Sequence, residues 1–162
     1  MKLANFLFEP IAKAALSVPT KRPPDVELTP NTLPYLDRWF IIPRNRWFNI
    51  YLHHFMASDN DTALHDHPWW NVSLLLKGDY LEHTIKEGGI NYKKQYCARD
   101  LKFRTAKSPH RIEINNGPSW SLFITGPTIR GWGFHCPKRW VPWKEFVKPE
   151  KPGEIGIGCG EP

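Results

Sequence analysis

Between residues 35 and 147, short apolar runs alternate with turn residues roughly every 8 to 12 positions, and no helical stretch separates them. Turns are expected at Lys77-Gly78-Asp79, Glu87-Gly88-Gly89, Asn115-Asn116-Gly117-Pro118 and Gly126-Pro127. About nine strands are expected, at Arg38–Ile42, Trp47–Met56, Trp70–Leu76, Tyr80–Lys86, Tyr92–Cys97, Leu101–Arg104, Arg111–Ile114, Ser119–Thr125 and Ile129–His135. So many short strands without intervening helices predict an all-β sandwich or a small barrel.

The segments on either side of this region have a different composition. Residues 3–17 carry apolar side chains at helical spacing, and Pro10 should kink this helix or start a second one. Residues 18–34 are rich in proline, and residues 148–162 are rich in glycine and proline. We therefore expect an N-terminal helix and Pro-rich arm (1–34), a β-barrel domain (35–147) and a flexible tail (148–162).

Charge and cysteine content limit the possible partners and location. The 162 residues have a formal net charge of +6, but lysine and arginine are scattered, so a small anionic ligand is expected rather than a nucleic acid. The apolar N-terminal stretch is too short and too charged for a membrane span. Three distant cysteines, Cys97, Cys136 and Cys159, are expected to be free thiols, which favours a reducing, cytoplasmic location.

Two histidines separated by one residue, His65 and His67, stand just before the apolar run that begins at Trp70. On a strand, residues i and i+2 point to the same face, so both imidazoles can converge on one point while Asp66 points away. Asn71 and Ser73 have the same parity and should line that face. Neutral imidazole is a common metal ligand, and this pair therefore predicts a metal site.

A third ligand is expected from a distant strand. His110 follows Pro109, opens a predicted strand and shares a face with Ile112 and Ile114. Three neutral histidines would suit Fe(II), Ni(II), Cu(II) or Zn(II), and they would leave the full positive charge on the ion. The alternative is a metal-free barrel in which these histidines form hydrogen bonds with Asn71, Ser73 or Asp66.

The spacing resembles the sequence motifs of the cupin superfamily. His65-x-His67 is followed by three residues, Asn71, six residues and Gly78, which is similar to the first cupin motif. The segment from Lys107 through His110 to Asn115 is a loose version of the second motif. The resemblance covers about residues 47–135. It departs from the family where Asn71 replaces the usual carboxylate and where the Pro-x-Gly turn is missing.

This resemblance implies a double-stranded β-helix, the cupin jelly roll, with an N-terminal helical extension. The three-histidine set is similar to that of thiol dioxygenases with this fold. It implies an Fe(II)-dependent oxidoreductase acting on a small anionic or thiol-containing substrate, with Zn(II), Ni(II) or Cu(II) as other possible metals. The alternatives are a metal-dependent isomerase, lyase or hydrolase, and a non-catalytic cupin that binds a small ligand. Cupins often form homodimers, so a dimer is also expected.

Further catalytic candidates come from the residues around these motifs. Strand alternation turns one of His53 and His54 inward, and we expect His54 and Asn71 to be catalytic residues. Arg104 and Arg111 flank the His110 loop and could bind a substrate anion, as could Arg130. Residues 125–137, with Trp140 and Trp143, could form an aromatic wall. Within this segment His135 could shuttle protons and Cys136 could be a reactive thiol.

Overall fold

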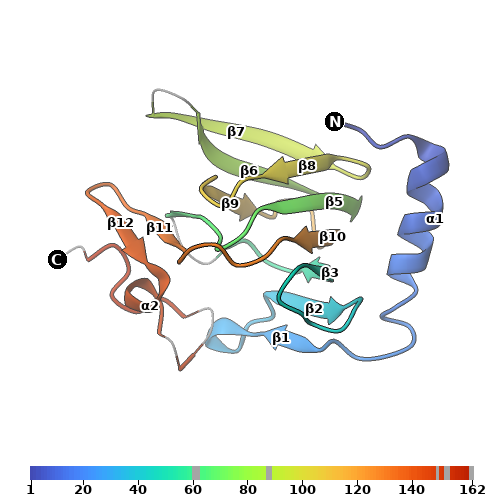
Figure 1. Ribbon diagram of the computed structural model, residues 1–162, viewed down its shortest axis with the longest axis horizontal. Helices are drawn as coiled ribbons and strands as arrows, with labels where there is room; N and C mark the ends of the chain where they lie inside the picture. Colours follow the sequence, from blue (N-terminus) through green and yellow to red (C-terminus); the bar gives the residue numbers. More distant parts are fainter. Residues whose placement is uncertain (60–62, 87–88, 149, 152–153, 161–162) are drawn as a thin grey trace.

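Two six-stranded antiparallel sheets form the computed structural model, which describes residues 1–59, 63–86, 89–148, 150–151 and 154–160 (Figure 1). The first sheet has the order β1 (Val26–Leu28), β2 (Leu36–Phe40), β3 (Asn49–Phe55), β10 (Ser119–Thr125), β5 (Asn71–Lys77) and β8 (Leu101–Arg104). The second has the order β12 (Trp140–Pro142), β11 (Gly133–His135), β4 (Leu64–His65), β9 (His110–Glu113), β6 (Asp79–Lys86) and β7 (Ile90–Cys97).

Each strand predicted from the sequence corresponds to a strand of the structure, although the last one is shortened to Gly133–His135. Three further strands are present. One of them, β1, lies in the Pro-rich arm and pairs with β2, and another, β4, has only two residues. The predicted turn at residues 87–89 lies partly outside the described residues. A 3-10 turn (Pro30–Thr32) links β1 to β2.

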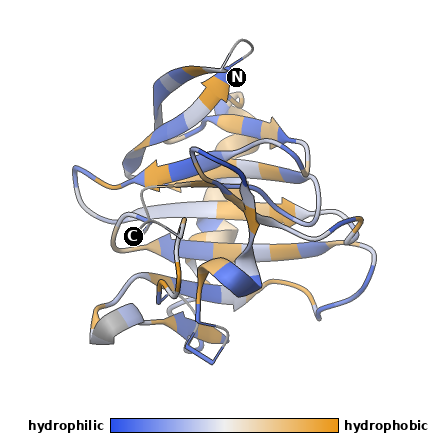
Figure 2. Cartoon of the chain, turned by 90° about the vertical axis from the view of Figure 1, so that its left-hand side faces the viewer, coloured by the Kyte–Doolittle hydropathy of each residue, from blue (hydrophilic) through white to orange (hydrophobic). Residues whose placement is uncertain are grey.

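Helix α1 (Asn5–Leu16) covers the outer face of the first sheet (Figure 1). It runs as one helix across Pro10, so of the two predicted effects of this proline, a kink or a second helix, the second does not occur. Its buried residues Phe8, Ala12 and Ala15 recur at helical spacing and pack against Leu52 and Leu74 of the sheet. Strands β3 and β5 are therefore buried or half-buried along most of their length. Across the molecule, hydrophobic and hydrophilic residues alternate along the strands (Figure 2).

Between the sheets, Leu36, Phe55 and Leu75 of the first sheet meet Tyr80 and Ile112 of the second. A separate apolar cluster lies beside the second sheet, where Phe134 stacks on Phe146 of the short helix α2 (Trp143–Phe146). The two clusters flank the interior of the barrel. That interior is not fully packed, and the space left in it forms the cavity described below.

The segment expected to be a flexible tail is attached to the barrel at several points. Cys159 forms a disulfide with Cys136, and the backbone N–H groups of Gly156 and Gly158 bond to the carbonyl of Phe146. The prediction of three free thiols, with a reactive Cys136, was therefore wrong. Only Cys97 is a free cysteine in the described part of the chain. The prediction failed because an odd number of cysteines does not prevent two of them from forming a disulfide. This removes the cysteine argument for a cytoplasmic location.

As for membranes, none of the described helices has the length and apolar character needed to cross a bilayer.

Candidate metal centre

His65, His67 and His110 gather at one point, as the sequence predicted. His65 ends β4 and His110 begins β9, and the two residues lie directly opposite each other in the antiparallel pair. Their ring centroids are 4.7 Å apart, and the ring of His67 lies 5.2 Å from His65 and 4.9 Å from His110. One nitrogen of each ring lies within 4.8 Å of the other two.

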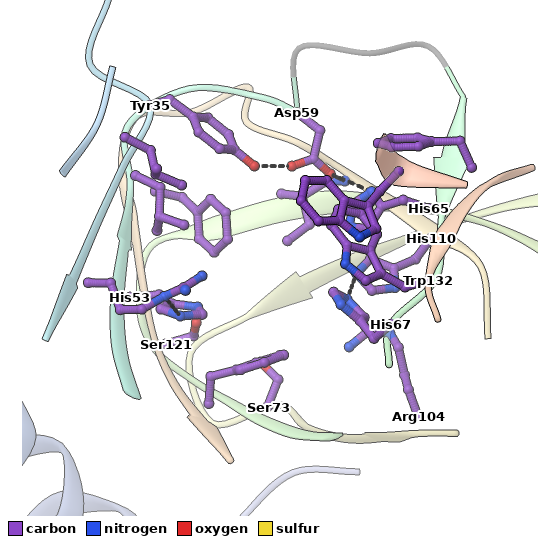
Figure 3. Close-up of a pocket in the computed structure, with 18 of the residues that line it drawn as sticks. Tyr35, His53, Asp59, His65, His67, Ser73, Arg104, His110, Ser121 and Trp132 are labelled. Atoms are coloured by element: carbon purple, nitrogen blue, oxygen red, sulfur yellow. Dashed lines mark hydrogen bonds and ion pairs between the residues drawn. The ribbon is translucent and has the colours of Figure 1, made fainter. Parts of the chain in front are cut away.

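The reason that His67 joins the cluster differs from the predicted one. Strand β4 ends at His65, so strand alternation does not fix the position of His67. Instead the His67 N–H donates to the carbonyl of Ala106 at 3.2 Å, and Arg130 donates to the carbonyl of His67 at 3.5 Å. The loop is therefore held by its backbone while the imidazole points into the barrel (Figure 3).

Burial keeps the three imidazoles neutral. Desolvation lowers the pKa of His65 below the ordinary 6.5, and it lowers the pKa of His67 and His110 well below that value. The positive charge of Arg104 acts in the same direction on all three, whereas Asp59, 3.9 Å from His65 Nδ1, opposes the shift of His65. Neutral rings have the free nitrogen lone pairs that a metal ion requires.

The donor set fits a divalent metal ion better than it fits mutual hydrogen bonding. The Nε2 atoms of His67 and His110 face each other at 3.4 Å, and at most one of them can donate to the other. His110 Nδ1 is buried and has no hydrogen-bond partner among the described residues. The Nδ1 atom lies on the other side of the ring from Nε2, so Nε2, which faces His67, is the atom that the geometry offers to a metal ion.

The cluster forms part of the wall of a cavity of about 460 Å³ between the two sheets (Figure 3). Most of the cavity is apolar, and the expected aromatic wall is present in part, since Trp132 and Trp143 line it and Trp140 does not. Three charged side chains line it, namely Arg38, Arg104 and Asp59. The cavity is therefore a hydrophobic chamber with a few separate polar groups, which is typical of small-molecule sites.

Asp59 and Tyr35 form a polar pair that sequence reasoning missed. The Tyr35 hydroxyl donates to Asp59, whose other carboxylate oxygen accepts from the N–H of Ile112 at 2.6 Å. This places the carboxylate in the cavity wall next to His65 (Figure 3). No sequence signal distinguished Asp59, because a single acidic residue in a polar loop is common.

Arg104 lines the cavity as expected, whereas Asn71 lies fully buried beside it. Arg104 donates to Asn71 Oδ1 at 3.4 Å and forms an ion pair with Glu82. Glu82 also lies 3.4 Å from Lys102, which contacts the hydroxyl of Tyr80. Asn71 thus supports a buried charge network rather than facing the three histidines.

The inward member of the histidine pair on β3 is His53 rather than His54. His53 is 4% exposed and lines the cavity. His54 points out of the barrel, where it stacks on Trp120 at 4.0 Å and lies 3.7 Å from Asp37. The structure therefore does not bring His54 to the site.

Arg111 and His135 also lie outside the cavity. Arg111 contacts His83 and Glu113 on the outer face of the second sheet. His135 Nε2 lies 3.1 Å from Asp66, which is 1% exposed and points away from the cluster as expected. Asp66 also accepts from the Gly133 N–H at 2.9 Å, from Trp140 Nε1 at 3.0 Å and from Arg130 at 2.8 Å.

Comparisons with known proteins bear on the fold. No protein-family model matches the chain, and no curated protein matches it in sequence. The DMSP lyase DddQ from Ruegeria pomeroyi DSS-3 is similar in structure, with 14% identity and a TM-score of 0.58 over 85% of this chain and 73% of that protein. HppE in its Fe(II) form is similar with 14% identity and a TM-score of 0.52, over 67% of this chain and 58% of that one.

A W96Y variant of oxalate decarboxylase from Bacillus subtilis also matches, with 14% identity and a TM-score of 0.47 over 57% of this chain. The match spans a quarter of that protein's length. Together with the two antiparallel sheets, the structural likeness to DddQ and HppE shows that the chain has the cupin fold, as the motifs predicted.

Proposed function

We propose that this protein is a metal-dependent enzyme that acts on a small anionic molecule inside the barrel. The observation that carries the proposal is the convergence of three neutral, buried histidines on one wall of a chamber of about 460 Å³. A structural metal site would normally be closed by a fourth protein ligand. The nearest carboxylate, that of Asp59, is instead bonded to Tyr35 and to the backbone of Ile112.

The charges in the cavity support an anionic substrate. Arg38 and Arg104 contribute two positive charges to the wall and Asp59 contributes one negative charge. The single carboxylate of Glu82 is paired with both Arg104 and Lys102, which leaves that group of three with a net positive charge. Neutral histidine ligands would add no negative charge to offset that of a divalent ion, so the cavity with its metal would be strongly positive. An anion that enters would therefore be attracted both by the metal and by the guanidinium groups.

When bound by His65, His67 and His110, a divalent ion would act as a Lewis acid or as a centre for dioxygen chemistry. Fe(II) is our first choice, and Zn(II), Ni(II) and Cu(II) suit the same donors. The protein's own contribution is then to bind and orient the substrate. Arg104 supplies the positive charge nearest the histidines, and the aromatic wall with Trp132 excludes water.

Two reaction classes follow from these residues. A dioxygenase-like oxidation of an anionic or thiol-containing substrate needs three neutral ligands with open positions and a dry chamber. A lyase, isomerase or hydrolase needs in addition a group that moves a proton, and the bonded pair of Tyr35 and Asp59 beside His65 favours this second class. A homodimer remains a prediction.

The first test is metal analysis of the purified protein. We expect about one equivalent of a divalent metal per chain and little in the variant His110→Ala; equal metal content in both would contradict the proposal. Oxygen uptake with Fe(II) and a panel of small thiols and carboxylates then separates the classes. Uptake supports the oxidoreductase, conversion without oxygen supports the lyase or hydrolase, and binding without conversion supports a non-catalytic cupin.

A further inference from the structure

A row of polar side chains crosses the first sheet inside the cavity. Arg38 on β2 lies directly opposite His53 on β3, and His53 lies directly opposite Ser121 on β10. All three line the cavity. The neighbouring pairs in β2 and β3, Leu36 with Phe55 and Phe40 with Tyr51, are apolar. On β2 and β3, this wall therefore carries one polar pair between two apolar pairs.

His53 fixes the orientation of the Arg38 guanidinium. Arg38 donates from Nε to His53 Nε2 at 2.9 Å, so this ring nitrogen is an acceptor and the histidine is neutral. Burial lowers the pKa of His53 well below 6.5, and the charge of Arg38 lowers it further. Three aromatic rings, those of Tyr51, Phe55 and Phe123, hold His53 in place. Among the described residues, Arg38 makes this hydrogen bond through Nε only. Its two terminal nitrogens, Nη1 and Nη2, therefore remain for another partner.

Arg38 and Arg104 differ in how their charges are paired. In the described ranges, no carboxylate lies within 4.0 Å of its guanidinium, whereas Arg104 is paired with Glu82. Desolvation lowers the pKa of the Arg38 guanidinium below its ordinary value, and the residue as a whole is half-buried in the cavity wall. The guanidinium lies over the ring of Tyr51, 5.1 Å from its centroid, which is a cation–π contact. Among the described residues, this half-buried cation therefore has an aromatic ring and an imidazole as neighbours but no counter-ion.

Arg38 stands apart from the three histidines within one continuous chamber. The ring of Phe123 lies 4.9 Å from His53 and 6.2 Å from His67, so one aromatic ring separates the two regions. In the close-up, His53 and Ser121 stand on the opposite side of the view from His65, His67 and His110 (Figure 3). A small molecule can therefore contact both regions at once.

We propose that Arg38, oriented by His53, is the subsite that binds a carboxylate of the substrate, while the reacting end of the same molecule lies at the three histidines. A carboxylate is the group that a planar guanidinium fork binds through two parallel hydrogen bonds. The substrate class is then a short carboxylic acid with its reacting group about one aromatic ring away. The word substrate rests on the proposed function, but anion binding at Arg38 does not require the metal.

The test measures anion binding by calorimetry in chelator-treated protein, so a failure to bind metal cannot affect it. The probes are propionate, its uncharged analogue propionamide, and methylphosphonate. We expect propionate to bind the wild type more tightly than either of the other two. Arg38→Gln should weaken propionate binding about 10- to 100-fold, because a charged hydrogen bond contributes about 1.5–3 kcal/mol. Arg46→Gln, in an exposed loop, should leave binding unchanged.

Several results would overturn the proposal. These are equal propionate affinity in the wild type and Arg38→Gln, no propionate binding without metal, and tighter binding of methylphosphonate or propionamide than of propionate. Thermal unfolding and metal content of Arg38→Gln control for folding, and both should match the wild type. If that variant does not fold, Arg38→Lys decides, since it keeps the charge but loses the fork. If Arg38→Lys binds propionate about as tightly as the wild type, the carboxylate is not bound through two parallel hydrogen bonds from the guanidinium, and the proposal is wrong.

Discussion

The two sides of the tripeptide His65-Asp66-His67 are built in opposite ways. On the outer side, the Asp66 carboxylate is saturated, because it accepts from a backbone N–H, an indole, an imidazole and a guanidinium. On the inner side, the rings of His65 and His67 face a cavity and a third histidine, His110, whose Nε2 lies 3.4 Å from that of His67. Groups that are fully paired hold the loop in position, and groups that lack partners are available to a ligand.

The largest expected effect is on metal affinity, when one of the three histidines on the inner side is removed. His110→Ala removes one of three nitrogen donors, and we expect the affinity for Zn(II) or Fe(II) to fall about a hundredfold to a thousandfold. Competition with a chromophoric chelator measures this change. His54→Ala, which removes an imidazole that points out of the barrel, should keep the affinity of the wild type. Equal losses in both variants would mean that the metal is not bound by the cluster.

Breaking the outer side should cost folding stability. Asp66→Ala leaves the buried Gly133 N–H and three partly exposed side-chain donors without their shared acceptor, so we expect the free energy of unfolding to fall by about 2–3 kcal/mol. Glu145→Ala removes an exposed pair with Arg139 and should cost less than about 0.5 kcal/mol. Urea unfolding compares the two variants. Similar small losses would refute the view that Asp66 anchors this loop.

Removing the disulfide between Cys136 and Cys159 tests whether the C-terminal segment stabilises the barrel, as Asp66 does on the outer side. Cys159→Ser opens a bond between residues 23 positions apart, and we expect a loss of about 2–3 kcal/mol in the unfolding free energy. Cys97→Ser changes an exposed free thiol and serves as the control. If the two variants unfold at the same urea concentration, the tail contributes nothing to the stability of the barrel.

The smallest effect concerns pH. His53, His65, His67 and His110 have folded-state pKa values below 6.5, so above that pH neither the folded nor the unfolded chain protonates them. Below it the unfolded chain takes up protons first, and stability falls as pH falls. In the presence of a chelator, His53→Gln should reduce this slope by up to about 1.4 kcal/mol per pH unit. An unchanged slope between pH 5 and 6.5 would contradict a neutral His53.

The barrel and its three histidines could be predicted because both depend on local pattern. Turn residues delimit the strands, and the spacing of His65 and His67 resembles a known motif. The assignment of His54 failed because alternation identifies the inner face only when the other face is polar. Helix α1 covers the outer face of β3 through Leu52, so both sets of side chains on this strand are buried or half-buried.

Arg38, Asp59 and Tyr35 could not have been singled out in the sequence. Each stands in or beside a strand among ordinary neighbours, and its role depends on pairings with residues far along the chain, such as Asp59 with Ile112. The disulfide depends in the same way on a fold that brings Cys136 and Cys159 together. Sequence patterns identify groups that act through spacing, whereas groups that act through distant pairing become visible only in the structure.

The tail has one further consequence. Ile155 lines the cavity and also pairs with Val147 through a β-bridge, so the last part of the chain is both a wall of the chamber and a surface segment. A molecule that fills the chamber would slow amide hydrogen exchange in residues 154–160. Deuterium uptake in that peptide would then report occupancy of the cavity without a label or a known reaction, which makes it a practical screen for ligands.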